Sequence, residues 1–258
     1  MALDRLSPEV LFCADAELGY ERSRTNFAAG DGLEMDETYR LAHLPLVAPD
    51  HPKVIVSREG TPYKMGCHPP VFSLVMPVPG EALAQSEANR ELGDDLRASP
   101  VGRKIAWSLL DRRRDRIHAT ICGSLTTGEP PHLDDVLRRE LAGIGPVSVE
   151  LRGLFSGNVN RGRLYLRAYP ECRLGQNVFR QIQRTLGRRE TDLYVVGIYN
   201  LIDDLDPAET SALARLIDRW WNRPILRLRA DHLWLLGAND DLVLDASIAD
   251  TVSLVRRR

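Results

Sequence analysis

A histidine and a threonine lie two residues apart in the stretch RIHATICGSL, at positions 118 and 120. The apolar residues around them predict a strand, in which residues i and i+2 project from the same face. His118 and Thr120 would then face one space, with Ala119 and Ile121 turned the other way. An imidazole can transfer protons as acid or base, and a hydroxyl can stabilise developing charge on a phosphate oxygen. We therefore treat His118 and Thr120 as candidate catalytic residues.

Arginines dominate the basic residues, and a dense run of them precedes this strand. Only three of the 34 basic residues are lysines. Genome composition explains such a bias, and so does a repeated need for planar guanidinium groups that bind phosphate or carboxylate. The run DRRRDR, residues 111–116, is interpreted either as a solvated turn or as a rim of phosphate-binding groups beside His118. The second interpretation makes Arg116 a candidate substrate-binding residue.

Composition limits the class of protein. The chain has 258 residues, of which 43% are hydrophobic and 27% charged, as expected for a soluble globular protein. A net charge of −2 argues against general binding of polyanions. The N-terminal residues do not resemble a signal peptide, and there is no run of apolar residues long enough to cross a membrane. These features predict a cytoplasmic protein that does not contact membranes, with a monomer as the default.

The cysteines and histidines show no metal-binding pattern. The four cysteines, Cys13, Cys67, Cys122 and Cys172, are far apart in the sequence, which predicts free thiols rather than a zinc site or a disulfide framework. Histidines and acids do not occur at ligand spacings. We expect neither a metal nor a cofactor. His43, His51 and His132 lie in polar or proline-rich connections and are interpreted as surface residues.

The elements that must position His118 follow a recurring pattern of strands and helices. Residues 1–65 have no sustained periodicity and are interpreted as an N-terminal extension packed on the main domain. Regular structure is expected after residue 65. Asp206, followed directly by Pro207 and three positions later by Glu209, has the spacing of a capping box and predicts the start of a helix. The expected strands are 71–78, 104–110, 117–125, 147–155, 162–169 and 193–202, with three short closing strands after residue 223; helices are expected between 83 and 96, 133 and 144, 174 and 186, and from 207 to 220.

This order predicts an α+β fold made of two similar lobes. Lobe one spans about 66–146 and lobe two about 147–258. The stretches LRASPVGRKIAWSLLDRRRDRIHATICGSL and LYVVGIYNLIDDLDPAE resemble the first and second motif regions of the two-histidine (2H) phosphoesterase superfamily. They are most similar to a little-characterised bacterial subgroup, and the resemblance covers roughly residues 65–250. The superfamily includes cyclic phosphodiesterases and RNA 2′-5′ ligase. It implies two antiparallel sheets that face each other across a central groove, with helices outside and one His-x-Thr or His-x-Ser pair from each sheet.

The second motif of that family is degenerate in this chain. With Tyr199 and the Asp206 helix start as anchors, its histidine position falls on Tyr194 and its hydroxyl position on Val196. A tyrosine with a reference pKa of about 10 can donate a hydrogen bond but is a poor base, and a valine can do neither. Losing one of two proton-transfer groups costs on the order of 10² to 10⁴ in rate. Tyr194 and Tyr199 are therefore candidate substrate-binding residues, and His232 or His68 is a candidate replacement for the missing histidine.

Three functions follow from these observations. The first is hydrolysis of a cyclic phosphate or phosphodiester in a nucleotide or short RNA, with His118 as general acid or base and Thr120 as a ligand of the phosphate oxygens. The second is a nucleotide- or RNA-binding module of the same fold with impaired catalysis. The third is an interaction protein in which residues 1–65 cover the groove.

Overall fold

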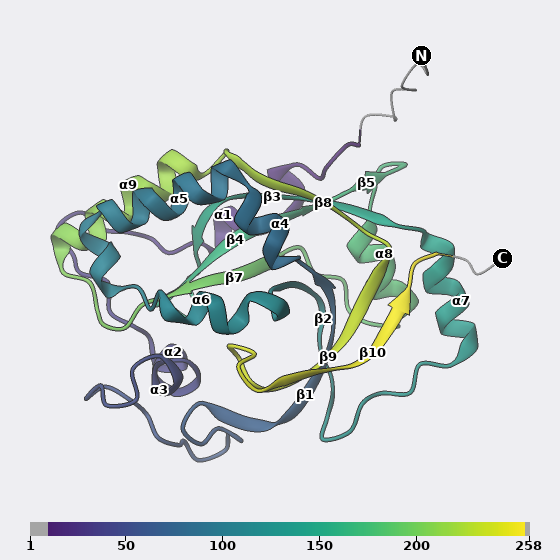
Figure 1. Cartoon of the computed structure of the whole chain (residues 1–258), viewed down its shortest axis with the longest axis horizontal. Coiled ribbons are helices and arrows are strands. Elements are labelled where there is room, and N and C mark those ends of the chain that lie inside the picture. The colour runs from purple at the N-terminus through teal and green to yellow at the C-terminus, as the bar shows by residue number, and fades with distance from the viewer. Residues whose placement is uncertain (1–9, 256–258) are drawn as a thin grey trace.

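Two four-stranded antiparallel sheets form the centre of the computed structural model, which describes residues 10–255 (Figure 1). The first sheet has the strand order β10-β9-β1-β2 and the second β7-β4-β3-β8. Helices pack around them, so the predicted α+β class with two antiparallel sheets is confirmed. The strands are β1 (Cys67–Pro77), β2 (His118–Thr127), β3 (Val147–Ser156), β4 (Arg163–Pro170), β7 (Val195–Asn200), β8 (Pro224–Ala230), β9 (His232–Asp240) and β10 (Ala246–Ser253), with β5 (Cys172–Arg173) and β6 (Gln176–Asn177) forming a short hairpin.

The four longest helices each begin after a residue whose side chain caps the first turn. Asp206 accepts a hydrogen bond from the Glu209 backbone N–H, and the Glu209 carboxylate accepts one from the Asp206 N–H. This reciprocal pair is the predicted capping box, and it satisfies two backbone donors at the start of α9. The helices are α1 (Tyr20–Ser23), α2 (Glu37–Ala42), α3 (Leu44–Val47), α4 (Gly80–Gln85), α5 (Glu87–Ala98), α6 (Ser108–Arg113), α7 (Asp135–Ile144), α8 (Val178–Thr185) and α9 (Pro207–Trp220), with 3₁₀ turns at Asp15–Glu17, Pro100–Lys104 and Arg114–Arg116.

One predicted strand is a helix. Residues 104–110 were expected to form a strand, but they form the end of a 3₁₀ turn and the start of α6. A short apolar run does not distinguish a strand from a buried helix by periodicity alone. Here Leu109 and Arg113, four residues apart, are both buried on one face of α6. The strand that neighbours β2 is β1 instead.

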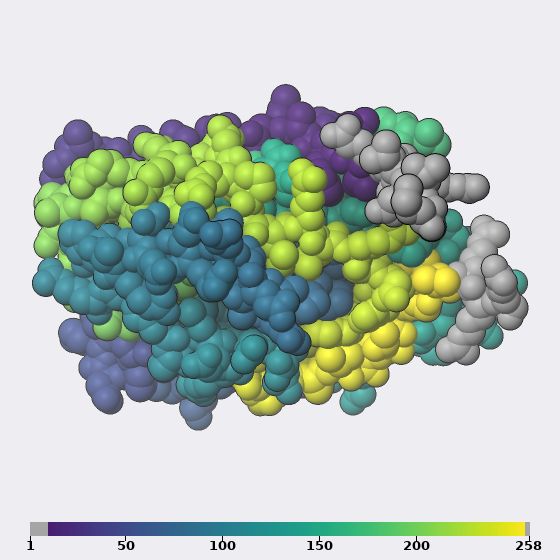
Figure 2. Space-filling model, turned by 45° about the horizontal axis from the view of Figure 1, so that its top comes forward, coloured from purple at the N-terminus to yellow at the C-terminus, as the bar shows by residue number. Residues whose placement is uncertain are grey.

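The chain returns to the first sheet at its C-terminal end. After β8 closes the second sheet against β3, β9 pairs with β1, and β10 pairs with β9. The first sheet thus combines residues 67–127 with residues 232–253, although the latter fall in the second of the two lobes drawn from the sequence. The space-filling view shows these last strands in yellow beside the blue segment that holds α4 and α5 (Figure 2).

The segment before β1 packs closely on the sheets. Tyr39 donates its hydroxyl hydrogen to the Leu201 carbonyl oxygen, and Leu33 forms a β-bridge with Leu205. His43 was expected at the surface, but its side chain is 0% exposed and its ring lies edge-on to Tyr39. Two nearby prolines suggested a connecting segment, but the residues next to His43 are apolar and form α2 and α3. Within residues 10–255, no helix is long and apolar enough to cross a membrane.

Candidate functional site

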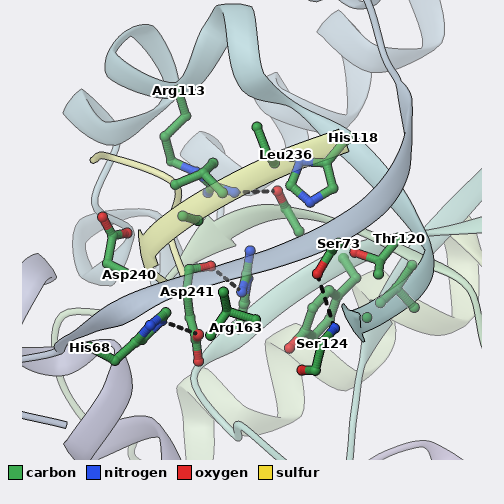
Figure 3. A pocket seen from close by; sticks show the side chains of 17 residues that line it. His68, Ser73, Arg113, His118, Thr120, Ser124, Arg163, Leu236, Asp240 and Asp241 are labelled. Atoms are coloured by element: carbon green, nitrogen blue, oxygen red, sulfur yellow. Dashed lines mark hydrogen bonds and ion pairs between the residues drawn. The ribbon is translucent and has the colours of Figure 1, made fainter. Parts of the chain in front are cut away.

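A cavity of about 250 Å³ lies between the two sheets (Figure 3). Strands β1, β2 and β9 of the first sheet and β4 and β7 of the second supply most of its walls. Two of its lining residues, Gly123 and Ser124, are exposed to solvent. Among the described residues, none before His68 lines it, so the N-terminal segment does not fill this central cavity. The lining residues are His68, Val71, Ser73, Arg113, His118, Thr120, Gly123, Ser124, Arg163, Tyr165, Val195, Gly197, Leu236, Ala238, Asp240, Asp241 and Val243.

Strand β2 presents His118 and Thr120 to the cavity. Its pleat turns Ala119 and Ile121 to the opposite face, where both are buried in the core. His118 lies opposite Pro77 at the start of the pairing with β1, and Thr120 lies opposite Val75. The imidazole and the hydroxyl therefore face one space, as the spacing in the sequence predicts.

His118 is a neutral imidazole at pH 7. Its Nδ1 lies 2.8 Å from the Arg116 carbonyl oxygen, which can only accept, so Nδ1 carries the hydrogen. Burial lowers the pKa of His118 to about 4, and the charges of Arg163 and Arg113 add to this against the opposing effect of the Arg116 carbonyl. Nε2 is then an unprotonated nitrogen in a wall of the cavity, the state that a general base requires.

Arg113 is one of two guanidinium groups in the cavity wall. It lies at the end of α6, its residue is 3% exposed, and its Nη2 donates to the Gly197 carbonyl oxygen at 2.9 Å. Burial, together with the charge of Arg163, lowers the pKa of Arg113 to about 9. The group therefore remains charged at neutral pH, although its charge is poorly solvated.

Arg163 is the second guanidinium, and it depends on a glycine across the sheet. Its Nη1 donates to the Asp241 carbonyl oxygen at 2.9 Å. A Cβ atom on Gly197 would lie 2.3 Å from Arg163 Nη2, so residue 197 must lack a side chain for Arg163 to lie where it does. Within residues 10–255, neither Arg113 nor Arg163 forms an ion pair with a carboxylate. The carboxylates of Asp240 and Asp241 also line the cavity and partly offset these two positive charges without pairing with them, so the guanidinium groups remain able to bind an anion.

The residues of β7 that face the cavity lie one position after Tyr194 and Val196, the two that the sequence resemblance indicated. Val195 and Gly197 face the cavity, whereas Tyr194 and Val196 are 0% exposed on the other side. A shift of one residue moves every side chain of a strand to the opposite face. The Tyr194 hydroxyl donates to the Thr191 carbonyl oxygen at 2.5 Å, and burial raises the pKa of Tyr194 to about 12. Tyr194 is thus a core residue rather than a ligand-binding one.

His68 lines the cavity on β1, opposite Asp241. Its Nε2 lies 3.3 Å from Asp241 Oδ1, and its Nδ1 lies 2.7 Å from the Pro69 carbonyl oxygen. Both partners are acceptors, so the ring is best satisfied when both nitrogens are protonated, and its hydrogen bond to Asp241 raises the pKa of His68. Burial opposes ionisation of Asp241, but the hydrogen bond from His68 and the neighbouring charges lower its pKa to about 2. Tyr63 also donates to Asp241, at 2.9 Å.

The other residues singled out from the sequence lie outside the central cavity. Tyr199 is buried edge-on against Trp107 and borders a separate hollow near α4. Arg116 donates from Nε to the Ala246 carbonyl oxygen at 2.9 Å. His232 begins β9, at the opposite end from the residues of that strand that reach the cavity, and its half-exposed ring lies 2.6 Å from Asp231. Of the two candidate replacement histidines, only His68 lies at the site.

The guanidinium groups were missed, although each left a signal in the sequence. Arg113 belongs to the run that was examined, and its spacing of four residues from Leu109 is helical. This helical spacing was overlooked because residues 104–110 were assigned to a strand. Arg163 and Tyr165 alternate with Leu164 and Leu166 on β4, so a charged residue shares a face with a buried aromatic one. Such alternation is typical of a strand with one face in solvent, so the sequence alone did not show that Arg163 faces an interior cavity.

Comparison with known proteins finds no family model that matches the chain and no significant match to a curated protein.

Proposed function

We propose that the central cavity binds the phosphate group of a nucleotide or a short RNA, and that the protein hydrolyses a cyclic phosphate or phosphodiester there. One observation carries this proposal: Arg113 and Arg163, which have no carboxylate partner among the described residues, flank a neutral His118. Guanidinium groups match the geometry of phosphate oxygens, and a neutral imidazole beside the bound anion can accept a proton from water. The proposal is consistent with the resemblance to the 2H phosphoesterases.

In the proposed reaction, a water oxygen attacks phosphorus and gives its proton to His118 Nε2. The bond from phosphorus to the leaving oxygen breaks, and that oxygen takes a proton from a second water. The hydroxide that remains takes the proton from His118, which returns the imidazole to its neutral form. The negative charge that builds on the other phosphate oxygens is stabilised by Arg113, Arg163 and the Thr120 hydroxyl. These groups belong to strands and a helix that are fixed before the ligand binds, so they need little reorganisation.

A second function, phosphate binding without turnover, is supported by the residues at the second motif. Val195 and Gly197 cannot transfer protons, and the hydrogen bonds of His68 to Asp241 and Pro69 occupy both of its nitrogens. No second imidazole is therefore free to protonate the leaving oxygen. In this alternative, the Arg163 guanidinium, which lies in the space that a side chain at position 197 would need, holds a phosphate oxygen.

The test is hydrolysis of 2′,3′-cyclic nucleotides and of short RNA ending in a cyclic phosphate, with binding measured in the same samples. His118→Ala and Arg163→Gln are compared with the wild-type protein. His232→Ala serves as the matched control, because it removes a histidine that lies outside the cavity. Hydrolysis is expected in the wild type and in the control, with a loss of about 10² to 10⁴ in His118→Ala.

Each pattern of results separates the two functions. Binding that is lost in Arg163→Gln, with no turnover in any variant, would establish the binding function. A hydrolysis rate that His118→Ala leaves unchanged would contradict the catalytic role. Failure of all these ligands to bind would contradict both functions. The proposed compartment is the cytoplasm, where unpaired thiols such as the four described here persist in reduced form.

A further inference from the structure

Three metal-ligating side chains meet at a place remote from the central cavity. Cys13, Glu17 and Cys172 each offer one ligand atom, and these two sulfurs and one carboxylate oxygen all lie within 4.8 Å of one another. Cys13 is buried, Cys172 is partly buried, and Glu17 is exposed, so solvent reaches one side of the cluster. None of the three lines the cavity around His118.

Backbone pairing brings these distant residues together. Phe12 forms an antiparallel bridge with Glu171, and on either side of it the Cys13 N–H donates to the Pro170 oxygen and the Cys172 N–H donates to the Leu11 oxygen. The 3₁₀ turn Asp15–Glu17 then folds Glu17 back toward Cys13. Figure 1 shows this N-terminal segment, in purple, running beside β5.

The same pairing favours a metal ion over a disulfide. With Phe12 opposite Glu171, Cys13 and Cys172 are diagonal neighbours on one face, and diagonal residues are about 7–8 Å apart. A disulfide joins Cα atoms that are about 4.4–6.8 Å apart, so it would require the backbone to move. A tetrahedral ion reaches sulfur at about 2.3 Å and a carboxylate oxygen at about 2.0–2.2 Å, which suits ligand atoms grouped as these are.

We propose that Cys13, Cys172 and Glu17 bind Zn²⁺ or a similar thiophilic divalent cation, with water as the fourth ligand. Each thiol releases its proton when its sulfur binds the ion. The three ligand charges then exceed the charge of the ion by one. Arg180 on α8, which donates from Nη2 to the Glu17 carbonyl oxygen at 3.2 Å, lies close enough to offset that excess. The bound ion would tie the N-terminal segment to the β5-β6 hairpin that follows β4.

The test uses the full chain, reduced and freed of metal, titrated with Co²⁺ under anaerobic conditions. Cobalt bound by two thiolates gives a sulfur-to-metal charge-transfer band and the visible absorption of tetrahedral coordination, and added Zn²⁺ should abolish both. Cys172→Ser and Glu17→Gln are the main variants, because both side chains reach solvent and their loss should not prevent folding. Cys13→Ser is added where it folds. Cys67→Ser, which removes an exposed thiol elsewhere, is the matched control.

We expect the charge-transfer band in the wild type and in Cys67→Ser, its loss or a fall in intensity in Cys172→Ser, and weaker cobalt binding in Glu17→Gln. Zn²⁺ should raise the melting temperature of the wild type and leave that of Cys172→Ser unchanged. Absence of the band in the wild type, or an unchanged band in Cys172→Ser, would overturn the proposal. So would a Cys13–Cys172 disulfide that forms in preference to the metal complex, detected by peptide mass spectrometry.

Discussion

At the scale of single residues, the site is governed by the charges around His118. An imidazole in water titrates near pH 6.5, but in this cavity burial, helped by Arg163 and Arg113, lowers its pKa to about 4. The same guanidinium groups that attract an anion therefore keep His118 unprotonated. Binding a phosphate would offset their charge and raise the affinity of the imidazole for a proton.

Removing one of these charges should shift the titration of His118 upward. In Arg163→Gln we expect the midpoint to rise from about pH 4 toward the ordinary value, because a cation that opposes protonation is gone. Histidine ring protons followed by NMR against pH would measure this without any substrate. Arg112→Gln, which removes an exposed arginine of the same sequence run, is the control. An unmoved midpoint in Arg163→Gln would show that burial alone sets the value.

Gly197 gives a steric test of the Arg163 position. Gly197→Ala would place a Cβ atom 2.3 Å from Arg163 Nη2 and force the guanidinium to move. Hydrogen bonds to charged groups contribute about 1.5–3 kcal/mol, so the affinity for a phosphate ligand should fall roughly tenfold to a hundredfold. Isothermal titration calorimetry measures this affinity. Gly123→Ala is the control, because its Cβ would meet nothing closer than 3.7 Å. Equal losses in both variants would contradict the steric explanation.

At the scale of elements, the capping box of α9 links a sequence signal to a buried network. The Glu209 side chain is 1% exposed and accepts hydrogen bonds from Asp206 N–H and from Arg103, while Lys104 lies 3.3 Å away. Desolvation opposes ionisation of Glu209, but these bonds lower its pKa. The start of α9 therefore fixes the 3₁₀ turn that leads into α6, and α6 carries Arg113.

Loss of the cap should be measurable in the stability of the protein. Asp206→Ala removes the acceptor of the Glu209 N–H and should lower the free energy of unfolding by about 1 kcal/mol, within a usual range of about 0.5–2 kcal/mol. Denaturation by urea at neutral pH provides the measurement. Asp218→Ala, an exposed acid on the same helix, should change it by less than about 0.5 kcal/mol. An equal loss in the free energy of unfolding in Asp206→Ala and Asp218→Ala would contradict a stabilising role of the cap.

The sequence predicted most helices and strands because their hydrophobic residues recur with a clear helical or strand spacing. Alternation marked β3 and β4, and the Asp206–Glu209 spacing marked α9. Residues 104–110 were misassigned because local pattern does not separate a short buried strand from a helix. The face of β7 was misplaced because Tyr194 and Val195 both suit a strand, and only the pairing with β4 decides which side each one faces. Arg113, Arg163 and His68 meet through tertiary contacts that no local pattern encodes.

At the scale of the whole molecule, acid should destabilise the fold through buried neutral histidines. His43 is 0% exposed, and burial, together with Arg163 and Arg113, lowers its pKa to about 3. Between that value and about pH 6.5 the unfolded chain binds a proton that the folded chain does not. The free energy of unfolding therefore decreases as the pH falls through this range.

Replacing the buried imidazole should weaken this dependence. His43→Phe keeps an aromatic ring against Tyr39 but removes the titrating group, so its stability should fall less between pH 6.5 and pH 4 than that of the wild type. Urea denaturation across this pH range gives the slopes. His132→Gln, which alters an exposed histidine, should follow the wild type. If the free energy of unfolding of His43→Phe falls with pH as steeply as that of the wild type, groups other than His43 cause the pH dependence.

The return of β9 and β10 to the first sheet has a consequence for how the molecule forms during translation. All four strands of the second sheet lie within residues 147–230, so that sheet can close while residues 232–253 are still in the ribosome. Until residues 232–253 emerge, β1 has only β2 as a neighbour and presents an unpaired edge that can join with another chain. Asp240 and Asp241 also arrive only then. The cavity is thus completed after the second sheet, and a polypeptide released before residue 232 would carry His118 in an unfinished site.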